Sequence, residues 1–468
     1  SILNQGNIQT SGGYVALLGA SVSNEGKIET AGGNAYLAAA ETVRVPVSGT
    51  GRIQLELSPA SINAAVANRK EGAIVTQGGQ VYMQAAALHT AMASVLQSGN
   101  IDTTGAQAGN VTLLAEGGNI QVDGRITANS TQPNQAGGRI VIGRDEDTGA
   151  LAKSTNVSGA TLESQRGFIE TSGEHLQVSG VKIQAKDWLL DPNDIVIDST
   201  NTTSGTGLAD AQTQNGISYI NTADITAALN TANVTIATSA SATGGNGDIT
   251  VNSAIANNSN KKLTLNATRD IALNAAYNGE TGSLQLTAGR DVNVNAAIYT
   301  PLASVGISAG QDLNFNSGAS VTIAGGAAYS ATLNATRDIY IRSNVSVNSW
   351  LNSSAGRDYY INANLSNNGF SYSLYAGRDM QVNSALSNQG TLGLYAARDL
   401  YINSNVTSIG AEVRLVGGNG TAWNSNAISG AISIANTARI SYGTGLSIVS
   451  GRSQTRSEEH TSELQLLR

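Results

Sequence analysis

The sequence contains no cysteine, which excludes disulfide bonds and thiolate metal sites. Aromatic residues make up only 4% of its 468 residues and charged residues only 13%, so it has little material for a wide globular core. Lysine and glutamate, which favour helices, are scarce, and this disfavours an all-α fold. No run of about eighteen apolar residues is present, so no helical membrane-spanning segment is predicted.

Charge and histidine content narrow the possible functions further. The net charge of −7 is spread thinly and no basic run occurs, so nucleic acid is not a predicted partner. The three histidines, His89, His175 and His460, lie far apart in the sequence and are predicted not to form a shared site. We therefore expect no metal and no cofactor.

What the sequence does contain is a phrase that returns about every 21 residues from Asp248 onward. Its clearest copies are RDIALN at 269–274, RDVNVN at 290–295, RDMQVN at 378–383 and RDLYIN at 398–403. A fixed period in this range is typical of a solenoid. The aspartate of the phrase stands at Asp248, Asp270, Asp291, Asp312, Asp338, Asp358, Asp379 and Asp399.

Each copy alternates between apolar and variable positions. The residues one and three after the aspartate are apolar, as Ile271 and Leu273 are, while the residue between them varies. This period of two predicts a strand with one buried face. A second strand precedes each copy, for example at 263–266 and 284–287, and a two-residue bend follows it. We therefore expect each coil to contain two strands, a tight bend between them and a polar turn.

Strands that repeat at one period must lie side by side in register, which predicts parallel sheets. One coil buries too few side chains to offset the ordering of about twenty residues, so coils are stable only when stacked. The predicted fold is therefore all-β, a right-handed parallel β-helix with coils of about 20–21 residues. The hand follows from the usual rule for parallel crossovers.

Two polar columns are predicted along the repeat. The fourth residue after the aspartate is asparagine in every copy except that of Arg342, and stacked asparagines form a ladder of hydrogen bonds. The arginine and aspartate pairs are predicted to stack as an exposed ladder of ion pairs, each worth little. The asparagine ladder comprises Asn252, Asn274, Asn295, Asn316, Asn362, Asn383 and Asn403.

Five tyrosines are the candidates for ligand binding. Tyr340, Tyr360 and Tyr401 occupy the outward position two after the aspartate, and Tyr375 and Tyr395 lie four before it. They are predicted to form exposed stripes on adjoining faces, which either stiffen the fold by stacking or offer aromatic faces to a glycan or peptide. The aspartates occur once per coil and do not converge as glycosidic catalysis requires, so no catalytic residue is predicted.

The amino-terminal part has a related repeat. The phrase N-x-G-x-I occurs at 4–8 and again at 24–28, and it combines with the strand GGYVALLG and the sequence AETV at 40–43. In this combination the segment resembles the filamentous-haemagglutinin family, the large exoproteins and adhesins that Gram-negative bacteria export by two-partner secretion. The resemblance covers about residues 1 to 186, and DWLLDPND at 187–194 resembles a junction common in such proteins. The Asn-Pro-rich opening of the family's secretion domain is missing, so a truncated amino terminus is expected.

Four parts of the chain are predicted. They are a haemagglutinin-type β-helical secretion-domain remnant at 1–186, an irregular junction at 187–240, a regular 21-residue-repeat β-helix at 241–455, and a segment at 456–468 that resembles a translated sequencing adapter and is excluded from fold reasoning.

Local patterns within these parts predict a few further elements. A strand is predicted at 53–57 and another at 234–236. Short helices are predicted at 224–230 and at 85–96, the latter with Leu88, Met92 and Val95 on one face.

The family resemblance implies a secreted or surface-exposed rod of a Gram-negative bacterium. Its partners would be an outer-membrane two-partner secretion transporter and a receptor or glycan on a host or bacterial surface. The leading expectation is adhesion to host cells, matrix or other bacteria. One alternative is the β-helical stalk of a contact-dependent growth-inhibition toxin, and a third is a glycan-cleaving β-helix enzyme, which would need clustered carboxylates in a cleft.

Overall fold

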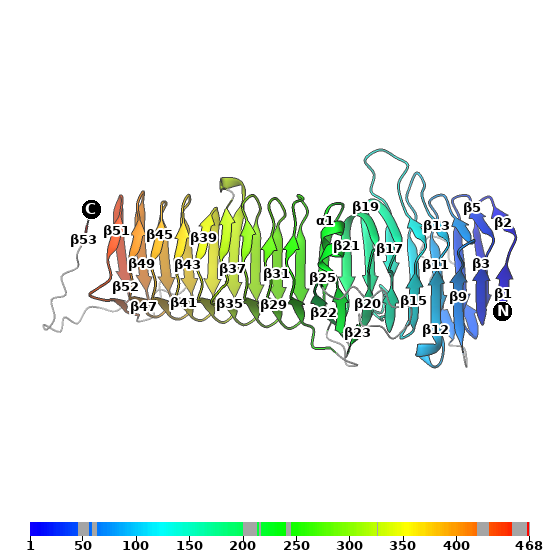
Figure 1. Cartoon of the computed structure of the whole chain (residues 1–468), viewed down its shortest axis with the longest axis horizontal. Coiled ribbons are helices and arrows are strands. Elements are labelled where there is room, and N and C mark those ends of the chain that lie inside the picture. Colours follow the sequence, from blue (N-terminus) through cyan, green and yellow to red (C-terminus); the bar gives the residue numbers. More distant parts are fainter. Residues whose placement is uncertain are drawn as a thin grey trace. The chain divides into compact units, whose positions relative to one another are not determined.

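The protein is described here from a computed structural model that forms two compact units, Ser1–Gly247 and Asp248–Arg468, called the amino-terminal and carboxy-terminal units. The structure describes residues 1–44, 56–58, 63–199, 213–214, 217–239, 245–324, 326–418, 430–451 and 466–467. Both units consist mainly of short strands that lie side by side (Figure 1).

Each regular coil of the carboxy-terminal unit contains three strands. In one coil, β28 (Leu263–Ala267), β29 (Ile271–Leu273) and β30 (Tyr277–Asn278) follow one another, and each pairs in parallel with its counterpart in the next coil. Ile271, for example, lies beside Val292, which is 21 residues later in the sequence. The predicted parallel β-helix and its coil length are therefore confirmed.

The strands of this unit form three ladders. The first contains β28, β31 (Leu284–Ala288), β34 (Val305–Ala309), β37 (Ser330–Ala335), β40 (Trp350–Ala355), β43 (Tyr372–Ala376), β46 (Leu392–Ala396), β49 (Glu412–Gly417) and β52 (Gly445–Ser450). The second contains β26 (Ile249–Val251), β29, β32 (Val292–Val294), β35 (Leu313–Phe315), β38 (Ile339–Ile341), β41 (Tyr359–Ile361), β44 (Met380–Val382), β47 (Leu400–Ile402) and β50 (Ile432–Ile434). The third contains β27 (Ile255–Ala256), β30, β33 (Ile298–Thr300), β36 (Val321–Ala324), β39 (Val345–Asn348), β42 (Leu365–Asn367), β45 (Leu386–Asn388), β48 (Val406–Ser408), β51 (Ile440–Tyr442) and β53 (Leu466–Leu467).

The prediction of two strands per coil is wrong, because a third strand occupies the place of the predicted polar turn. Its strands are only two to four residues long, too short for alternation to distinguish them from a corner. The signal that could have found them is a column of apolar residues seven positions after the aspartate in most coils. Ile298, Leu365 and Leu386 belong to this column, and all three are buried in the core.

The amino-terminal unit is also built of parallel ladders, with longer corners. One sheet contains β1 (Ile2–Asn4), β4 (Ser21–Asn24), β9 (Ala64–Asn68), β12 (Ala93–Gln97), β15 (Asn119–Val122), β18 (Ser154–Asn156) and β20 (His175–Gln177). A second ladder contains β2 (Asn7–Thr10), β5 (Lys27–Thr30), β10 (Ala73–Val75), β13 (Asn100–Asp102), β16 (Arg125–Thr127) and the first halves of β19 (Thr161–Ser172) and β21 (Lys182–Asp191). A third contains β3 (Tyr14–Gly19), β6 (Asn34–Ala39), β11 (Val81–Ala85), β14 (Val111–Ala115), β17 (Arg139–Ile142), the second halves of β19 and β21, and β25 (Asn233–Ala237).

The amino-terminal unit contains a few further strands. β7 (Thr42–Arg44) pairs antiparallel with β8 (Glu56–Ser58). β22 (Asp194–Ile197) pairs in parallel with β24 (Ile217–Ile220), which also pairs antiparallel with β23 (Thr213–Gln214). The helical elements are η1 (Thr90–Met92), α1 (Thr222–Leu229) and, in the carboxy-terminal unit, η2 (Gly326–Ala328).

The asparagine of the N-x-G-x-I phrase closes a corner of the amino-terminal unit from the inside. The side chain of Asn4 donates to that of Asn24 at 2.7 Å, Asn24 donates to Asn68 at 2.8 Å, and Asn68 donates to Gln97 at 2.8 Å. All four side chains are buried, so the amides need one another as partners. The repeat of the phrase therefore reflects a hydrogen-bonded column.

The helix predicted at residues 85–96 is wrong. Ala85 ends β11, η1 occupies the corner, and Val95 is buried in β12, while Leu88 and Met92 point to solvent. Alanine content favours a helix here, but Val95 lies in register between Val66 and Ile120 of the neighbouring coils. Pairing with two existing strands outweighs a helix propensity of well under about 1 kcal/mol per residue.

The helix predicted at 224–230 is confirmed as α1. Its N-cap is Asn221, whose side chain accepts the backbone N–H of Ala223 at 2.8 Å, and Asp224 lies in the first turn. The strand predicted at 234–236 is confirmed as part of β25. Of the strand predicted at 53–57, residues 53–55 lie outside the described residues and 56–57 belong to β8.

Other predicted boundaries fall as follows. The predicted junction at 187–240 lies within the amino-terminal unit, and β21 runs across its start. Of the segment predicted to be an adapter translation, residues 456–465 and 468 lie outside the described residues, and 466–467 form β53 beside β51.

Adjacent residues of β28 allow a test of the inward and outward positions. Leu265 is buried, whereas Thr264 faces outward. We expect Leu265→Ala to lower the free energy of unfolding by about 2–5 kcal/mol, because it leaves a cavity in a narrow core. Thr264→Ala should change it by less than about 0.5 kcal/mol. Urea unfolding of the full chain followed by circular dichroism measures both, and equal effects would contradict the assigned register.

Candidate functional site

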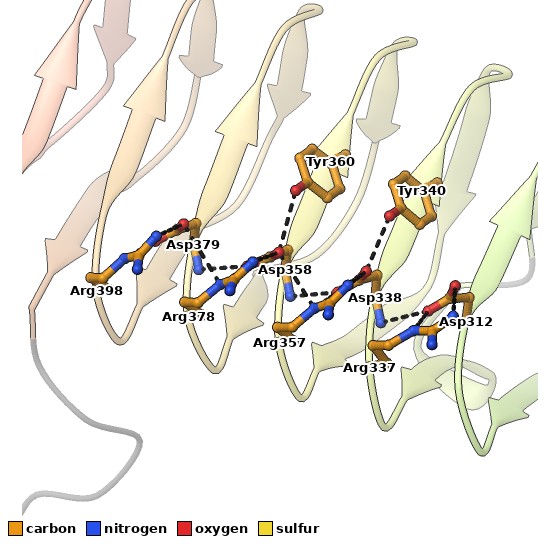
Figure 2. A network of polar contacts seen from close by, with 10 residues as sticks. All are labelled: Asp312, Arg337, Asp338, Tyr340, Arg357, Asp358, Tyr360, Arg378, Asp379 and Arg398. Atoms are coloured by element: carbon orange, nitrogen blue, oxygen red, sulfur yellow. Dashed lines mark hydrogen bonds and ion pairs between the residues drawn. The ribbon is translucent and has the colours of Figure 1, made fainter.

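The corner between the first and second ladders carries the Arg-Asp pairs. The arginine of each coil donates through Nε and Nη2 to both carboxylate oxygens of the aspartate in the preceding coil, as Arg378 does to Asp358 (Figure 2). The distance from Arg378 Nε to Asp358 Oδ1 is 2.8 Å. Such two-point pairing fixes the geometry of both side chains. The same arrangement joins Arg269 to Asp248, Arg290 to Asp270, Arg337 to Asp312, Arg357 to Asp338 and Arg398 to Asp379.

Each carboxylate also binds the backbone of the next coil. Asp358 Oδ1 accepts the N–H of Asp379 at 3.2 Å, and Asp338 Oδ1 accepts the N–H of Asp358 at 3.1 Å. Where Gln311 replaces the arginine, the backbone bond remains, since Asp291 Oδ1 accepts the N–H of Asp312 at 3.0 Å. The aspartate is therefore first an acceptor for a backbone amide and second an ion-pair partner.

The expectation of an exposed ladder is wrong for Asp338, Asp358 and Asp379, which are buried. The side chain of Asp358 is 1% exposed, whereas that of its partner Arg378 is 44% exposed. The reason is the bend itself, which leaves one backbone N–H per coil without a strand partner and places the carboxylate inside to accept it. At the rung of Asp358 the arginine alone faces solvent, whereas the side chains of Asp248 and Asp291 are 27% and 24% exposed.

Electrostatics at the corner favour ionised carboxylates. Burial alone would raise the pKa of Asp270 and of Asp338, but hydrogen bonds from the arginine and the backbone N–H of the next coil outweigh it and lower both pKa values. Asp270 and Asp338 therefore remain charged at neutral pH, as acceptor-only groups suited to hold donors.

The predicted asparagine column forms a ladder of side-chain hydrogen bonds. Each Nδ2 donates to the Oδ1 of the asparagine in the preceding coil at 2.7 to 3.0 Å. The donor and acceptor pairs are Asn274 to Asn252, Asn295 to Asn274, Asn316 to Asn295, Asn383 to Asn362 and Asn403 to Asn383. At the one exception, Arg342 Nη1 donates to Asn316 Oδ1 at 3.2 Å. These side chains are mostly exposed, so the ladder fixes the turn from the outside.

Three of the candidate tyrosines lie beside the Arg-Asp ladder. The rings of Tyr340 and Tyr360 stack at 4.9 Å with 3° between their planes, and their hydroxyls donate to Asp338 and Asp358 at 3.1 and 3.3 Å (Figure 2). Gln381 lies in register between Tyr360 and Tyr401, so Tyr401 is set apart from the stack. Burial and then the hydrogen bond to Asp338 raise the pKa of Tyr340 to about 12.

The other two tyrosines stack in the same way on the first ladder. Tyr375 of β43 and Tyr395 of β46 have ring centroids 4.9 Å apart and planes 11° apart. All five candidate tyrosines are half-buried. Because adjacent rings face one another along the ladder, less of each face is open to a ligand. This arrangement supports the interpretation that the stripes stiffen the coils.

A buried ionic cluster in the amino-terminal unit was not foreseen from the sequence. Arg144 Nη1 lies 2.6 Å from Asp191 Oδ2 and 3.9 Å from Glu170 Oε1. Ser172 Oγ donates to Glu170 at 2.9 Å, and Ser239 Oγ donates to Asp191 at 3.2 Å. The two carboxyl groups belong to β19 and β21, and no repeat in the sequence marks them.

The chemistry of this cluster is governed by burial. Glu170 and Asp191 are 4% and 5% exposed, and burial raises the pKa of both despite the nearby Arg144. Neither carboxyl group is open to a substrate, which supports a structural role for the pair. His89 lies in the corner after β11, His175 lies in β20, and His460 is outside the described residues.

Comparison of the sequence with protein-family models and with curated proteins finds no match. In the part of the chain that the structure describes, no helix is both long and apolar enough to cross a membrane. The same residues include no group of three or more His, Asp or Glu side chains placed to hold a metal ion.

The double role of the aspartates can be tested at one rung. Asp358→Ala should lower the free energy of unfolding by about 1–3 kcal/mol, because it leaves the N–H of Asp379 without its acceptor. Arg378→Ala should have a smaller effect, since its side chain is 44% exposed and Arg357 Nε, 3.6 Å from Asp358 Oδ2, still offsets the charge of the carboxylate. Urea unfolding of both variants decides this, and an equal or larger loss in Arg378→Ala would refute the backbone role.

The buried cluster predicts that the variant Glu170→Gln gains stability over the wild type in a pH-dependent way. Because the pKa of Glu170 is raised, its favourable contribution is complete below the ordinary value of 4.5 and is lost as pH rises through the raised pKa. Glu170→Gln, which can still accept from Ser172, should match the wild type in acid and become more stable than it toward pH 7.

Hydrogen exchange of peptides covering β19 and β21 would report this local effect. Glu116→Gln, on an exposed corner of the same unit, is the control and should change stability by less than about 0.5 kcal/mol. A gain in stability for Glu170→Gln that is the same at every pH would contradict the assignment.

Proposed function

We propose that this chain is a section of an exported adhesin, a β-helical rod that attaches to host cells, matrix or other bacteria. The observation that carries the proposal is the in-register repeat of outward side chains in the carboxy-terminal unit. It turns single residues into rows, such as the half-exposed arginines from Arg337 to Arg398. Rows of this kind suit many weak contacts with an extended surface.

The sequence resemblance of residues 1–186 supports the same proposal. The asparagines of the N-x-G-x-I phrase there, Asn4 and Asn24, lie in a buried column that continues to Asn68, so the phrase is part of a stacked coil rather than a chance repeat. By this proposal the protein is secreted or displayed on a Gram-negative surface, and an outer-membrane two-partner secretion transporter exports it.

The structure offers less support for an enzyme. The alternative of glycan cleavage requires carboxylates that a sugar can reach. The aspartates of the repeat are held by backbone and arginine donors, and Glu170 and Asp191 are buried beside Arg144. A scaffold whose acidic groups already have partners is better suited to present a surface than to transfer protons.

Adhesion can be measured with the full chain immobilised on beads. Beads should bind epithelial monolayers, matrix-coated wells or Gram-negative bacteria more than beads carrying urea-unfolded chain, and soluble folded chain should compete. Replacement of Tyr340, Tyr360 and Tyr401 by Ser should leave binding unchanged if the stripes stiffen the fold, with Phe replacements as the matched control. Failure of the folded chain to bind any of the three surfaces would refute the proposal.

A further inference from the structure

One aromatic pair in the carboxy-terminal unit is arranged differently from the tyrosine stripes. Trp350, at the start of β40, is 51% exposed, and its ring centroid lies 5.4 Å from that of Phe370 in the next coil, with 35° between the planes. In the preceding coil the residue in register with Trp350 is the small Ser330. The indole is thus supported by a ring on one side only. The two rings form an aromatic pair whose indole is exposed, and Trp is enriched at interfaces because it combines a large apolar ring with a polar N–H.

The pair is held in place from inside the coil by Asn367. This residue is completely buried, and its Nδ2 donates to the carbonyl of Ser349 at 2.9 Å, immediately before Trp350. Its Oδ1 accepts the N–H of Gly369 at 3.1 Å and of Phe370 at 3.3 Å. One amide therefore positions both aromatic residues. A platform fixed before binding loses little conformational entropy when a ligand arrives.

The surroundings of the pair are polar but uncharged. The outward positions of the third ladder beside it form a row of hydroxyls, Ser346, Ser366 and Ser387, which lie in register. Asn348 and Asn368 are exposed at the same corner. The third-ladder strands from β33 to β48 and the corners that follow them, up to Ala411, contain no charged residue in the sequence.

This combination matches the chemistry of a neutral sugar. The C–H face of a pyranose stacks on an aromatic ring, and its hydroxyls need donors and acceptors at the edge, which serine hydroxyls and asparagine amides provide. A sulfated glycan or a charged peptide would find no opposite charge on this side, and its own charges would be desolvated without a partner.

We propose that Trp350 and Phe370 form a stacking platform for a neutral glycan, bordered by the hydroxyl row of Ser346, Ser366 and Ser387. This inference rests on the proposed adhesin function and specifies its ligand class. Asn367 is the positioning residue of the platform.

The test uses the full chain and an array of neutral oligosaccharides of glucose, galactose and N-acetylglucosamine, with heparin fragments and sialylated oligosaccharides beside them. The wild type should bind neutral members. Trp350→Ala should weaken that binding at least tenfold, and Trp350→Phe should retain most of it. Tyr299→Ala removes a similarly exposed ring, which lies on the third ladder, so it is the matched control and should bind as the wild type does.

Folding is checked by the urea midpoint, which Trp350→Ala should preserve because the side chain is half exposed. Asn367→Ala should weaken binding while Trp350 and Phe370 are unchanged, as expected for a positioning residue. Binding to heparin or sialylated members only, no binding to neutral members, or equal binding by Trp350→Ala would each overturn the platform. If Trp350→Ala binds the array as the wild type does and its beads still adhere to cells, the adhesin proposal stands and the platform fails.

Discussion

In-register stacking of coils is the interaction on which the rest of this structure depends. Because each strand pairs in parallel with the same strand of the next coil, each residue lies beside the residue at the equivalent position of its neighbour. Columns of residues are therefore the units of stability, apolar inside and hydrogen-bonded at the corners. A sequence with few aromatic residues can fold in this way, because each coil closes the core of the coil beside it.

The same stacking gives the sides of the carboxy-terminal unit different chemistry. At the corner between the first and second ladders, Asp358 accepts a backbone N–H and pairs with Arg378, and of these two side chains only the arginine reaches solvent. The rings of Tyr340 and Tyr360 beside it stack on each other. At the corner between the third and first ladders, by contrast, Trp350 at the start of β40 remains half exposed, and the third-ladder strands from β33 to β48 carry no charged residue. The hydrogen-bonded columns on one side support the coils. The uncharged aromatic corner on another side is the surface that we propose for binding.

Much of this could be predicted from the sequence wherever a residue type recurs with the coil. The inward position of Ile271 and the ladder from Asn252 to Asn316 follow from a period of two within a period of about 21. The burial of Asp358 could not be predicted, because the sequence does not show that a backbone amide of the next coil points at its carboxylate. Val95 was assigned to a helix because local composition does not contain the register that places it in a strand. Glu170 has no counterpart in other coils, and nothing in the sequence indicates its burial.

The Arg-Asp row also has a direction. In every rung that carries it, the donors come from the later coil and the carboxylate from the earlier one, as with Arg398 and Asp379. If such a stack is cut between two coils, one cut face presents carboxylate acceptors and the other presents arginine donors. Asp399 Oδ1 accepts the N–H of Ala431 from the following layer at 3.0 Å, and its Oδ2 lies 3.3 Å from Arg398 Nε of its own coil. Two such faces attract each other when stacks meet head to tail and repel each other when they meet head to head. The stacked coils of the carboxy-terminal unit therefore have an intrinsic electrostatic polarity.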